Sequence, residues 1–468
     1  MTNYNAVTSE VVDKLKAIIG DKYVYTDSDK LETYSHDEVT DPRYIKMPEV
    51  VVLPVNAEEV AEIIKLANSY LIPIVPRGAG TGLACAAVPF KGGIVVSLER
   101  MNRILEIDTE NMIMITEPGV TTESVQKEAN EKGFLYAGDP CSGDSSFIGG
   151  NVATNAGGNK AVKYGVTRNQ IAGLEMVTPS GEIITLGGKL KKDASGYSLM
   201  NLVIGSEGTL GIVTKIYLKI VALPKHTMDL LAIFKDLDSA IALAPKLMGI
   251  GVSPVCVEFM DNATIQCVEG FLREKLPHSA DGYYIIVQIA GDNEEVLEDQ
   301  CVLIDEIATE MGAVEVLVAD PTVIWKARKA YAEADRARSL VFSMEDIVVP
   351  INKIPETVRY IEDLSKKYNV AIHCCGHAGD GNIHANILKD QHSDKEWEEI
   401  LPAVQSEIYA MVYGINGKLS GEHGIGYKRV AALEKYGNPT EIKMMKAVKM
   451  ALDPNLIMNP GKVISFDC

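Results

Sequence analysis

Residues 139–173 read DPCSGDSSFIGGNVATNAGGNKAVKYGVTRNQIAG, a run of glycines among small polar side chains with few charges. The glycines that recur through this segment are Gly149, Gly150, Gly157, Gly158 and Gly165. Because glycine has no Cβ, such a segment lets the backbone approach a flat polar ligand closely. An ordinary surface loop does not need glycine at such regular intervals. The segment therefore predicts a binding loop.

Two shorter loops repeat this theme. PRGAGTG at residues 76–82 follows a predicted strand but does not open a helix, so it is not a dinucleotide fingerprint. Its amide N–H groups and Arg77 suit a diphosphate, although alone it fits a structural turn equally well. LVIGSEGTLGIVT at residues 202–214 places three further glycines around Glu207. Three such loops predict one large cofactor held mainly by main-chain contacts.

Length and composition exclude several classes of protein. With 468 residues, 47% hydrophobic and 23% charged, the chain should fold into at least two domains. A net charge of −19 argues against a nucleic-acid partner. The chain shows no secretory signal and no run of about 18 apolar residues, so we expect no membrane span and a cytoplasmic protein. Its eight cysteines lack any CxxC spacing, so an iron–sulfur cluster would belong to a partner.

The pattern of apolar residues suggests four segments. A helical leader at 1–45 precedes a first domain at 46–224, which opens with a strand, an amphipathic helix and a second strand. From 225 to 420, strands alternate with long helices, one of them expected over 322–338. This alternation predicts an antiparallel sheet backed by helices. The segment 421–468 is expected to be mostly helical and to return to the first domain.

A second constellation lies late in the chain. HAGDGNIH at 377–384 and SGEHGIG at 420–426 bring together His377, His384, Glu422 and His423. Five of the eight histidines fall between residues 373 and 423. Imidazole and carboxylate are the ligands that hold a divalent ion with an open coordination position. The alternative is a polar loop with incidental histidines.

These motifs together resemble the FAD-linked dehydrogenases of D-2-hydroxy acids, in the vanillyl-alcohol oxidase superfamily of flavoproteins. The resemblance spans about residues 45–465 and rests on PRGAGTG, IGGNVATNAGG, YGVTRNQIAGL, SGYSL with GSEGTLGI, HAGDGNIH, SGEHGIG and NPGK, in the family's order. It implies an α+β fold in which a two-part FAD-binding domain of the vanillyl-alcohol oxidase type carries a cap domain.

The resemblance also implies roles in FAD binding. Arg77, Gly78, Ala79, Gly80, Thr81 and Gly82 would line the pyrophosphate. Pro140, Ser145, Gly149, Gly150, Ala153, Thr154, Asn155, Gly165 and Val166 would follow the isoalloxazine and ribityl groups. Glu207, Gly208 and Ile212 would meet the adenine end, and Asn459 would return to the flavin ring. No histidine follows the first glycine loop, so the FAD is expected to be non-covalent.

The implied reaction removes two electrons from a 2-hydroxy acid, with hydride passing from Cα to flavin N5. His377, His384 and Glu422 would bind one divalent metal ion (Zn, Fe or Mn), braced by Asp380 and Asn382. His423 would be the general base and Arg328 would bind the substrate carboxylate, whereas Arg336 and Arg338 are expected on the surface.

The substrate and the electron acceptor follow from the same resemblance. Ala332 and Met344 occupy positions where hydroxyglutarate dehydrogenases offer polar or basic groups, which favours a small monocarboxylate, lactate first and glycolate next. The electrons would pass to a separate partner, such as an electron-transferring flavoprotein, an iron–sulfur subunit or a quinone.

The sequence leaves three alternatives open. The chain could be a D-2-hydroxyglutarate dehydrogenase. It could instead be a non-catalytic flavin subunit that relays electrons within a larger complex, although such a subunit could have lost the histidine motifs. A metallohydrolase built on the histidine cluster alone would leave the glycine loops unexplained.

Overall fold

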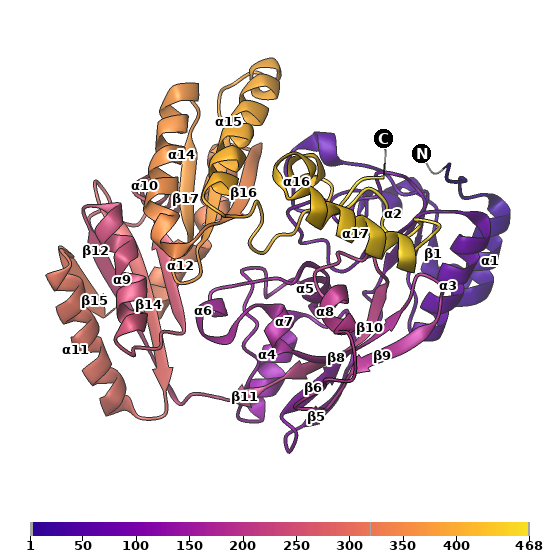
Figure 1. The fold of residues 1–468 in the computed structure, drawn as a ribbon, viewed down its shortest axis with the longest axis horizontal. Helices are drawn as coiled ribbons and strands as arrows, with labels where there is room; N and C mark the ends of the chain where they lie inside the picture. The colour runs from indigo at the N-terminus through magenta and orange to yellow at the C-terminus, as the bar shows by residue number, and fades with distance from the viewer. Residues whose placement is uncertain (1–2, 319, 467–468) are drawn as a thin grey trace. The chain divides into compact units, whose positions relative to one another are not determined.

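The computed structural model describes residues 3–318 and 320–466 and contains two compact units. Unit 1 draws its residues from Met1–Gly157, Val166–Leu223 and Glu422–Cys468. Unit 2 draws its residues from Gly158–Gly165 and Pro224–Gly421. The chain combines α-helices with sheets that are mostly antiparallel, which confirms the predicted α+β class (Figure 1).

The first sheet of unit 1 has the order β1-β2-β4-β3. Its strands are β1 (Val24–Tyr25), β2 (Val50–Val52), β3 (Ile74–Arg77) and β4 (Ile94–Ser97). Strand β4 lies between β2 and β3 and is parallel to both. The two strands of the predicted strand–helix–strand unit, β2 and β3, are therefore not direct neighbours in the sheet. Helix α3 (Ala57–Tyr70) connects β2 to β3 and buries an apolar face that includes Ile63 and Ile64.

The N-terminal segment is part of this layer and not a separate leader. Helix α1 (Ser9–Ile19) begins after Thr8, whose side chain caps the amide of Val11. Val11, Leu15 and Ile19 recur at helical spacing and lie in the same buried cluster as α3. Strand β1 extends the sheet as an antiparallel partner of β2.

The second sheet of unit 1 is antiparallel, with the order β5-β6-β10-β8-β9. Its strands are β5 (Ile104–Asp108), β6 (Ile113–Thr116), β8 (Ile171–Val177), β9 (Ile183–Gly187) and β10 (Ile212–Lys219); β7 (Phe134–Leu135) pairs with β11 (Val221–Ala222). The remaining helices of the unit are α2 (Ser28–Glu32), α4 (Thr122–Glu131), α5 (Ile148–Thr154), α7 (Thr167–Gln170), α8 (Leu199–Val203), α16 (Val430–Tyr436) and α17 (Pro439–Leu452).

Unit 2 is built on a seven-stranded antiparallel sheet of order β15-β12-β14-β13-β17-β18-β16. Its strands are β12 (His226–Phe234), β13 (Cys256–Met260), β14 (Tyr283–Gly291), β15 (Glu315–Val318), β16 (Phe342–Val348), β17 (Ile372–His377) and β18 (Asn382–Leu388). Its helices are α6 (Ala161–Tyr164), α9 (Leu237–Gly249), α10 (Asn262–Leu272), α11 (Glu294–Glu310), α12 (Pro321–Lys329), α13 (Tyr331–Arg338), α14 (Ile354–Tyr368) and α15 (Asp394–Gly414). Helices α14 and α15 lie side by side (Figure 1).

The single helix expected over 322–338 is two helices, α12 and α13, which meet at Ala330. Neither glycine nor proline marks this break, so no local signal predicts it. The break leaves the guanidinium of Arg328 5.1 Å from the ring centroid of Tyr331. Among the described residues, no helix combines the length and apolar character of a membrane-spanning segment.

Replacing Leu15 with Ala tests the integration of the N-terminal helix. The side chain is fully buried, so the truncation should cost unit 1 about 2–5 kcal/mol of stability. Thermal unfolding followed by circular dichroism measures this cost, with the exposed Asp13→Ala on the same helix as the control. Equal melting temperatures for the two variants would mean that α1 is a dispensable appendage.

Candidate active site

A cavity in unit 1 is lined by the glycine loops. Predicted cofactor residues along its wall are Arg77, Gly78, Gly80, Gly82, Gly149, Gly150, Ala153, Thr154, Glu207, Gly208 and Ile212. A Cβ on Gly78 would lie 3.6 Å from the Cα of Gly150, so two backbone segments run close together here. A Cβ on Gly150 would meet no atom within 4 Å, because this glycine faces open space. Glycine backbone thus forms a large part of the wall, which suits a large cofactor with a diphosphate.

Several predicted cofactor residues do not line this cavity, namely Ala79, Thr81, Pro140, Ser145, Asn155, Gly165, Val166 and Asn459. The Asn459 amide donates to the carbonyl oxygens of Ala86, at 3.0 Å, and Glu207, at 2.7 Å. It therefore joins three chain segments, and its contact with the flavin ring stays a prediction. Gly165 groups with unit 2.

The Arg77 side chain, which lines the cavity, also binds the backbone of the N-terminal segment. Its guanidinium donates to the backbone oxygens of His36, at 2.7 Å, and Thr33, at 3.3 Å. Gly80, with a φ of +82°, makes room for it, since a Cβ there would lie 2.1 Å from Arg77 Nη2. Arg77 therefore holds the first glycine loop against the N-terminal segment.

Glu207 holds the C-terminal segment in unit 1. Its carboxylate accepts hydrogen bonds from the amides of Ile425, at 2.7 Å, and Gly426, at 2.8 Å. A Cβ on Gly424 would lie 2.7 Å from Glu207 Oε1, so glycine is needed there. Burial raises the pKa of Glu207 to about 7. Its carboxylate thus binds two backbone amides, and its contact with adenine stays a prediction.

In unit 2, one face of the sheet gathers polar side chains. Residues two apart on a strand point to the same side, and directly opposed residues share that side. His377 lies opposite Asn382 on β18 and opposite Glu258 on β13. His384 lies opposite Asp346 on β16. The strand register therefore brings residues from four strands to one face.

Glu258 organises one end of this face. It is fully buried and accepts from Arg328 Nη2 at 2.8 Å and from His377 Nδ1 at 2.6 Å. Burial alone would raise the pKa of Glu258, but the charges of His377 and Arg328 lower it below the ordinary value. With the ring proton on Nδ1, His377 presents Nε2 as the acceptor or ligand atom. Arg328 itself is 1% exposed.

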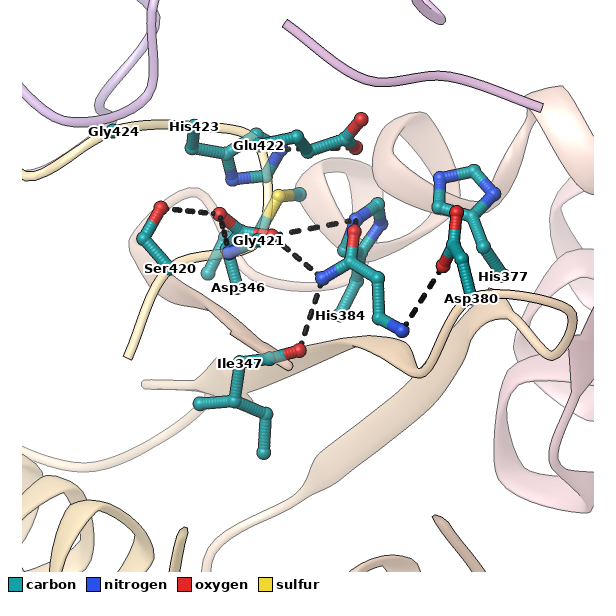
Figure 2. A network of polar contacts seen from close by, with 12 residues as sticks. Asp346, Ile347, His377, Asp380, His384, Ser420, Gly421, Glu422, His423 and Gly424 are labelled. Atoms are coloured by element: carbon teal, nitrogen blue, oxygen red, sulfur yellow. Dashed lines mark hydrogen bonds and ion pairs between the residues drawn. The ribbon is translucent and has the colours of Figure 1, made fainter. Parts of the chain in front are cut away.

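His384 and Asp346 form the other end, shown in Figure 2. His384 Nδ1 is 3.2 Å from the Tyr331 hydroxyl and Nε2 is 3.8 Å from Asp346 Oδ1. Asp346 accepts from Asn382 Nδ2, at 2.8 Å, and from Ser420 Oγ, at 2.7 Å. The rings of His377 and His384 are edge to face, with centroids 5.4 Å apart. The structure thus brings these two predicted ligands together.

Glu422 and His423 begin the C-terminal segment of unit 1. His423 Nε2 lies 3.7 Å from Glu422 Oε1, and both side chains are about one-eighth exposed, at 13% and 12%. A Cβ on Gly157 would lie 2.4 Å from Glu422 Oε2. The predicted base and the predicted carboxylate ligand are therefore neighbours on a partly accessible loop.

Sequence reasoning missed Glu258, Asp346 and Tyr331 as members of this site. Glu258 and Asp346 were visible as acids inside the apolar strands VCVEFM and FSMEDIV. A charge in a buried strand needs a partner, which is a usable signal. Tyr331 carries no such signal, because its role depends on the break before α13.

Comparison with known proteins gives matches over most of the chain. Residues 48–187 match a family described as "FAD binding domain", and residues 223–463 match "FAD linked oxidases, C-terminal domain". A D-lactate dehydrogenase of Anaerostipes hadrus is 38% identical over 471 residues, covering 98% of each chain. Glycolate oxidase subunit GlcD of Bacillus subtilis (strain 168) is 36% identical, again over 98% of each chain. A solved structure of p-cresol methylhydroxylase shares the fold, with a TM-score of 0.82 at 17% identity over 97% of both chains.

The raised pKa of Glu207 predicts a pH-dependent stability. Its folded pKa of about 7 exceeds the ordinary 4.5, so the folded chain binds more protons between these values. The stabilising contribution is therefore present at low pH and is lost as the pH rises through this window. Glu207→Gln cannot titrate, so wild type should lose melting temperature relative to this variant between pH 5 and pH 8. Parallel pH profiles would contradict the assignment.

Proposed function

Because this chain belongs to the FAD-linked oxidase family, we propose that it oxidises a small D-2-hydroxy acid to the 2-oxo acid. Lactate is the preferred candidate and glycolate the next. The observation that carries the proposal is the pair of buried histidines on one sheet face, each braced by polar partners, in a chain whose other unit has a glycine-lined cavity. A relay subunit has no use for such a pair.

FAD bound in the cavity would supply the acceptor for two electrons. The wall glycines, from Gly78 to Gly82 and at Gly149 and Gly150, would hold it through backbone amides. No histidine stands after the first loop to attach it covalently, so we propose that it dissociates.

His377, His384 and Glu422 are the proposed ligands of one divalent metal ion, which would polarise the substrate oxygen. The Glu258 hydrogen bond orients His377 Nε2, and metal-bound histidines are commonly oriented in this way. Asp346 accepts from the amide of Gly421 at 3.1 Å, and Glu422 follows one peptide later, about 3.8 Å along the chain. Chain continuity thus supports Glu422 as the third ligand. Zinc, iron and manganese all accept this ligand set.

His423 is the proposed general base that removes the hydroxyl proton, since a neutral imidazole suits this task near pH 7. Arg328 is proposed as a positioning residue, because its guanidinium pairs with the carboxylate of Glu258. Binding of the substrate carboxylate by Arg328 stays a prediction. The buried apolar Met344, beside Tyr331, favours a monocarboxylate over a dicarboxylate.

The two electrons would leave for a separate protein, an electron-transferring flavoprotein or an iron–sulfur subunit. This part of the proposal rests on the sequence, which offers no CxxC spacing for a cluster of its own.

Replacing His423 with Asn should leave flavin content intact and slow flavin reduction by substrate about 10²–10⁴-fold, since the proton would lose its acceptor. Anaerobic stopped-flow measurement of flavin absorbance gives the rate. His226→Asn, a histidine at the start of β12, is the control. Reduction of the His423 variant at the wild-type rate would remove this residue from the mechanism.

Replacing Glu422 with Ala, or treating the enzyme with a chelator, should lower activity and metal content without releasing FAD. Elemental analysis measures the metal content of the sample, and the visible spectrum of the same sample measures its FAD content. Glu131→Ala, an exposed carboxylate in α4, provides the control. Normal turnover by a metal-free preparation would refute the metal assignment.

Replacing Gly150 with Leu should abolish FAD retention while leaving the fold intact. The new side chain would enter open space, and the helical position imposes no positive φ. Gly249→Leu, also in open space at the end of α9, is the matched control. The ratio of flavin to protein after gel filtration measures FAD retention in both variants. A normal ratio in the Gly150 variant would mean that the cofactor binds elsewhere.

A further inference from the structure

A second cluster of potential metal-binding side chains lies in unit 2, made of residues that the proposed reaction does not use. Cys267 comes from α10, Asp335 from α13 and His373 from β17. The Cys267 thiol is 3.6 Å from Asp335 Oδ1, and His373 Nδ1 is 2.5 Å from the same oxygen. One potential ligand atom from each residue lies within 4.8 Å of the other two.

The separations are close to those of ligands on one zinc ion. Bond lengths of about 2.3 Å to sulfur and about 2.1 Å to oxygen place two tetrahedral ligands about 3.6 Å apart. The observed distance between Cys267 Sγ and Asp335 Oδ1 is 3.6 Å. The shorter His373–Asp335 hydrogen bond would have to open by about 0.9 Å to reach the separation of an oxygen and a nitrogen ligand.

The cluster is reachable from solvent. A pocket formed between α10 and α13 is lined by Cys267, His373, Gln266 and Arg338, together with Phe271 and small residues. Cys267 is partly exposed, whereas Asp335 and His373 are buried at 1% and 4%. A small ion therefore has an entry path, and water from the pocket can fill a fourth coordination position.

A buried acceptor oxygen lies next to this cluster. Asn386, opposite His373, donates to Asp335 Oδ2 at 2.6 Å and is 1% exposed. Among the described residues, the Asn386 side-chain oxygen has no hydrogen-bonding partner. It is therefore a further acceptor that a bound ion or its water could use.

We propose that Cys267, Asp335 and His373 bind a zinc ion, as a site separate from the one proposed for the reaction. Binding would release the thiol proton and any proton on His373 Nδ1 to solvent. The ion would tie α10 and α13 to β17. Tyr331 lies one helical turn before Asp335 on α13 and contacts His384, so the ion would also steady the hydroxyl at the candidate active site.

Arg338 provides a sharp consequence of this geometry. Its Nη1 lies 3.2 Å from His373 Nε2, and a guanidinium can only donate. With zinc on Nδ1 the ring proton must sit on Nε2, so the two donors would face each other. Arg338 must then turn away and keep only its pairing with Asp390. Arg338→Gln, whose amide oxygen accepts, should bind zinc more tightly than wild type.

Alkylation of the holoenzyme with iodoacetamide, with and without zinc, tests the site. Peptide mass spectrometry follows Cys267, and the exposed Cys141 serves as an internal control. Zinc should slow the reaction of Cys267 at least about tenfold, because the thiolate becomes a ligand, and leave Cys141 unchanged. His373→Asn should lose the protection, and Arg338→Gln should show it at lower zinc concentration.

Zinc protection that persists in His373→Asn, or no protection in wild type, would overturn the proposal. If Cys267 does not react even without zinc, X-ray absorption at the zinc edge decides. A zinc–sulfur distance of about 2.3 Å that disappears in Cys267→Ala supports the site, and its absence in wild type contradicts it. The metal site proposed for the reaction includes no cysteine, so failure of either proposal can be distinguished from failure of the other.

Discussion

The buried carboxylate of Glu258 is the constraint on which the candidate active site depends. A charge with no solvent exposure is costly unless paired, and Arg328 and His377 provide the pairing. Removing one partner of such a buried pair typically costs about 3–5 kcal/mol. The same contacts fix the ring of His377. The contacts of Glu258 therefore both stabilise the centre of the sheet and orient the proposed ligand His377.

The register of four antiparallel strands extends this constraint across the sheet. Alternation places Glu258, His377, His384 and Asp346 on one face, where α12 and α13 supply Arg328 and Tyr331. Glu345, next to Asp346, points to the other face and is bound by Gln405 of α15. A hairpin turn between β17 and β18 makes the register possible. Gly381 has a φ of +89° there, and a Cβ would lie 2.0 Å from the Val349 oxygen.

Much of this architecture was readable from the sequence, for identifiable physical reasons. Glycine spacing marked the cavity wall because only glycine permits close backbone approach, and Gly78, Gly149, Gly150 and Gly208 line it. The histidine motifs marked the sheet face because imidazoles rarely cluster by chance. Long side chains were less predictable. Arg77 and Asn459, both predicted cofactor residues, each bind backbone carbonyls from distant segments, and the sequence does not reveal these contacts.

Other differences between the sequence prediction and the structure also arise from contacts between residues that are distant in the chain. The partners of Glu258 lie 70 and 119 residues away in the chain, so the sequence could reveal the buried acid but not its contacts. The break at Ala330 has no local signal, and the N-terminal helix joins the core through contacts with α3. Local pattern predicts which residues can act, and strand register and helix packing determine which of them meet.

The visible spectrum of the purified protein under anaerobic conditions tests the central claim most directly. The spectrum is recorded before and after addition of D-lactate, with glycolate, L-lactate and D-2-hydroxyglutarate as comparisons. Oxidation of a small 2-hydroxy monocarboxylate predicts that D-lactate or glycolate bleaches the flavin absorbance band and that D-2-hydroxyglutarate does so far more slowly. A stable flavin band that neither D-lactate nor glycolate bleaches would contradict it.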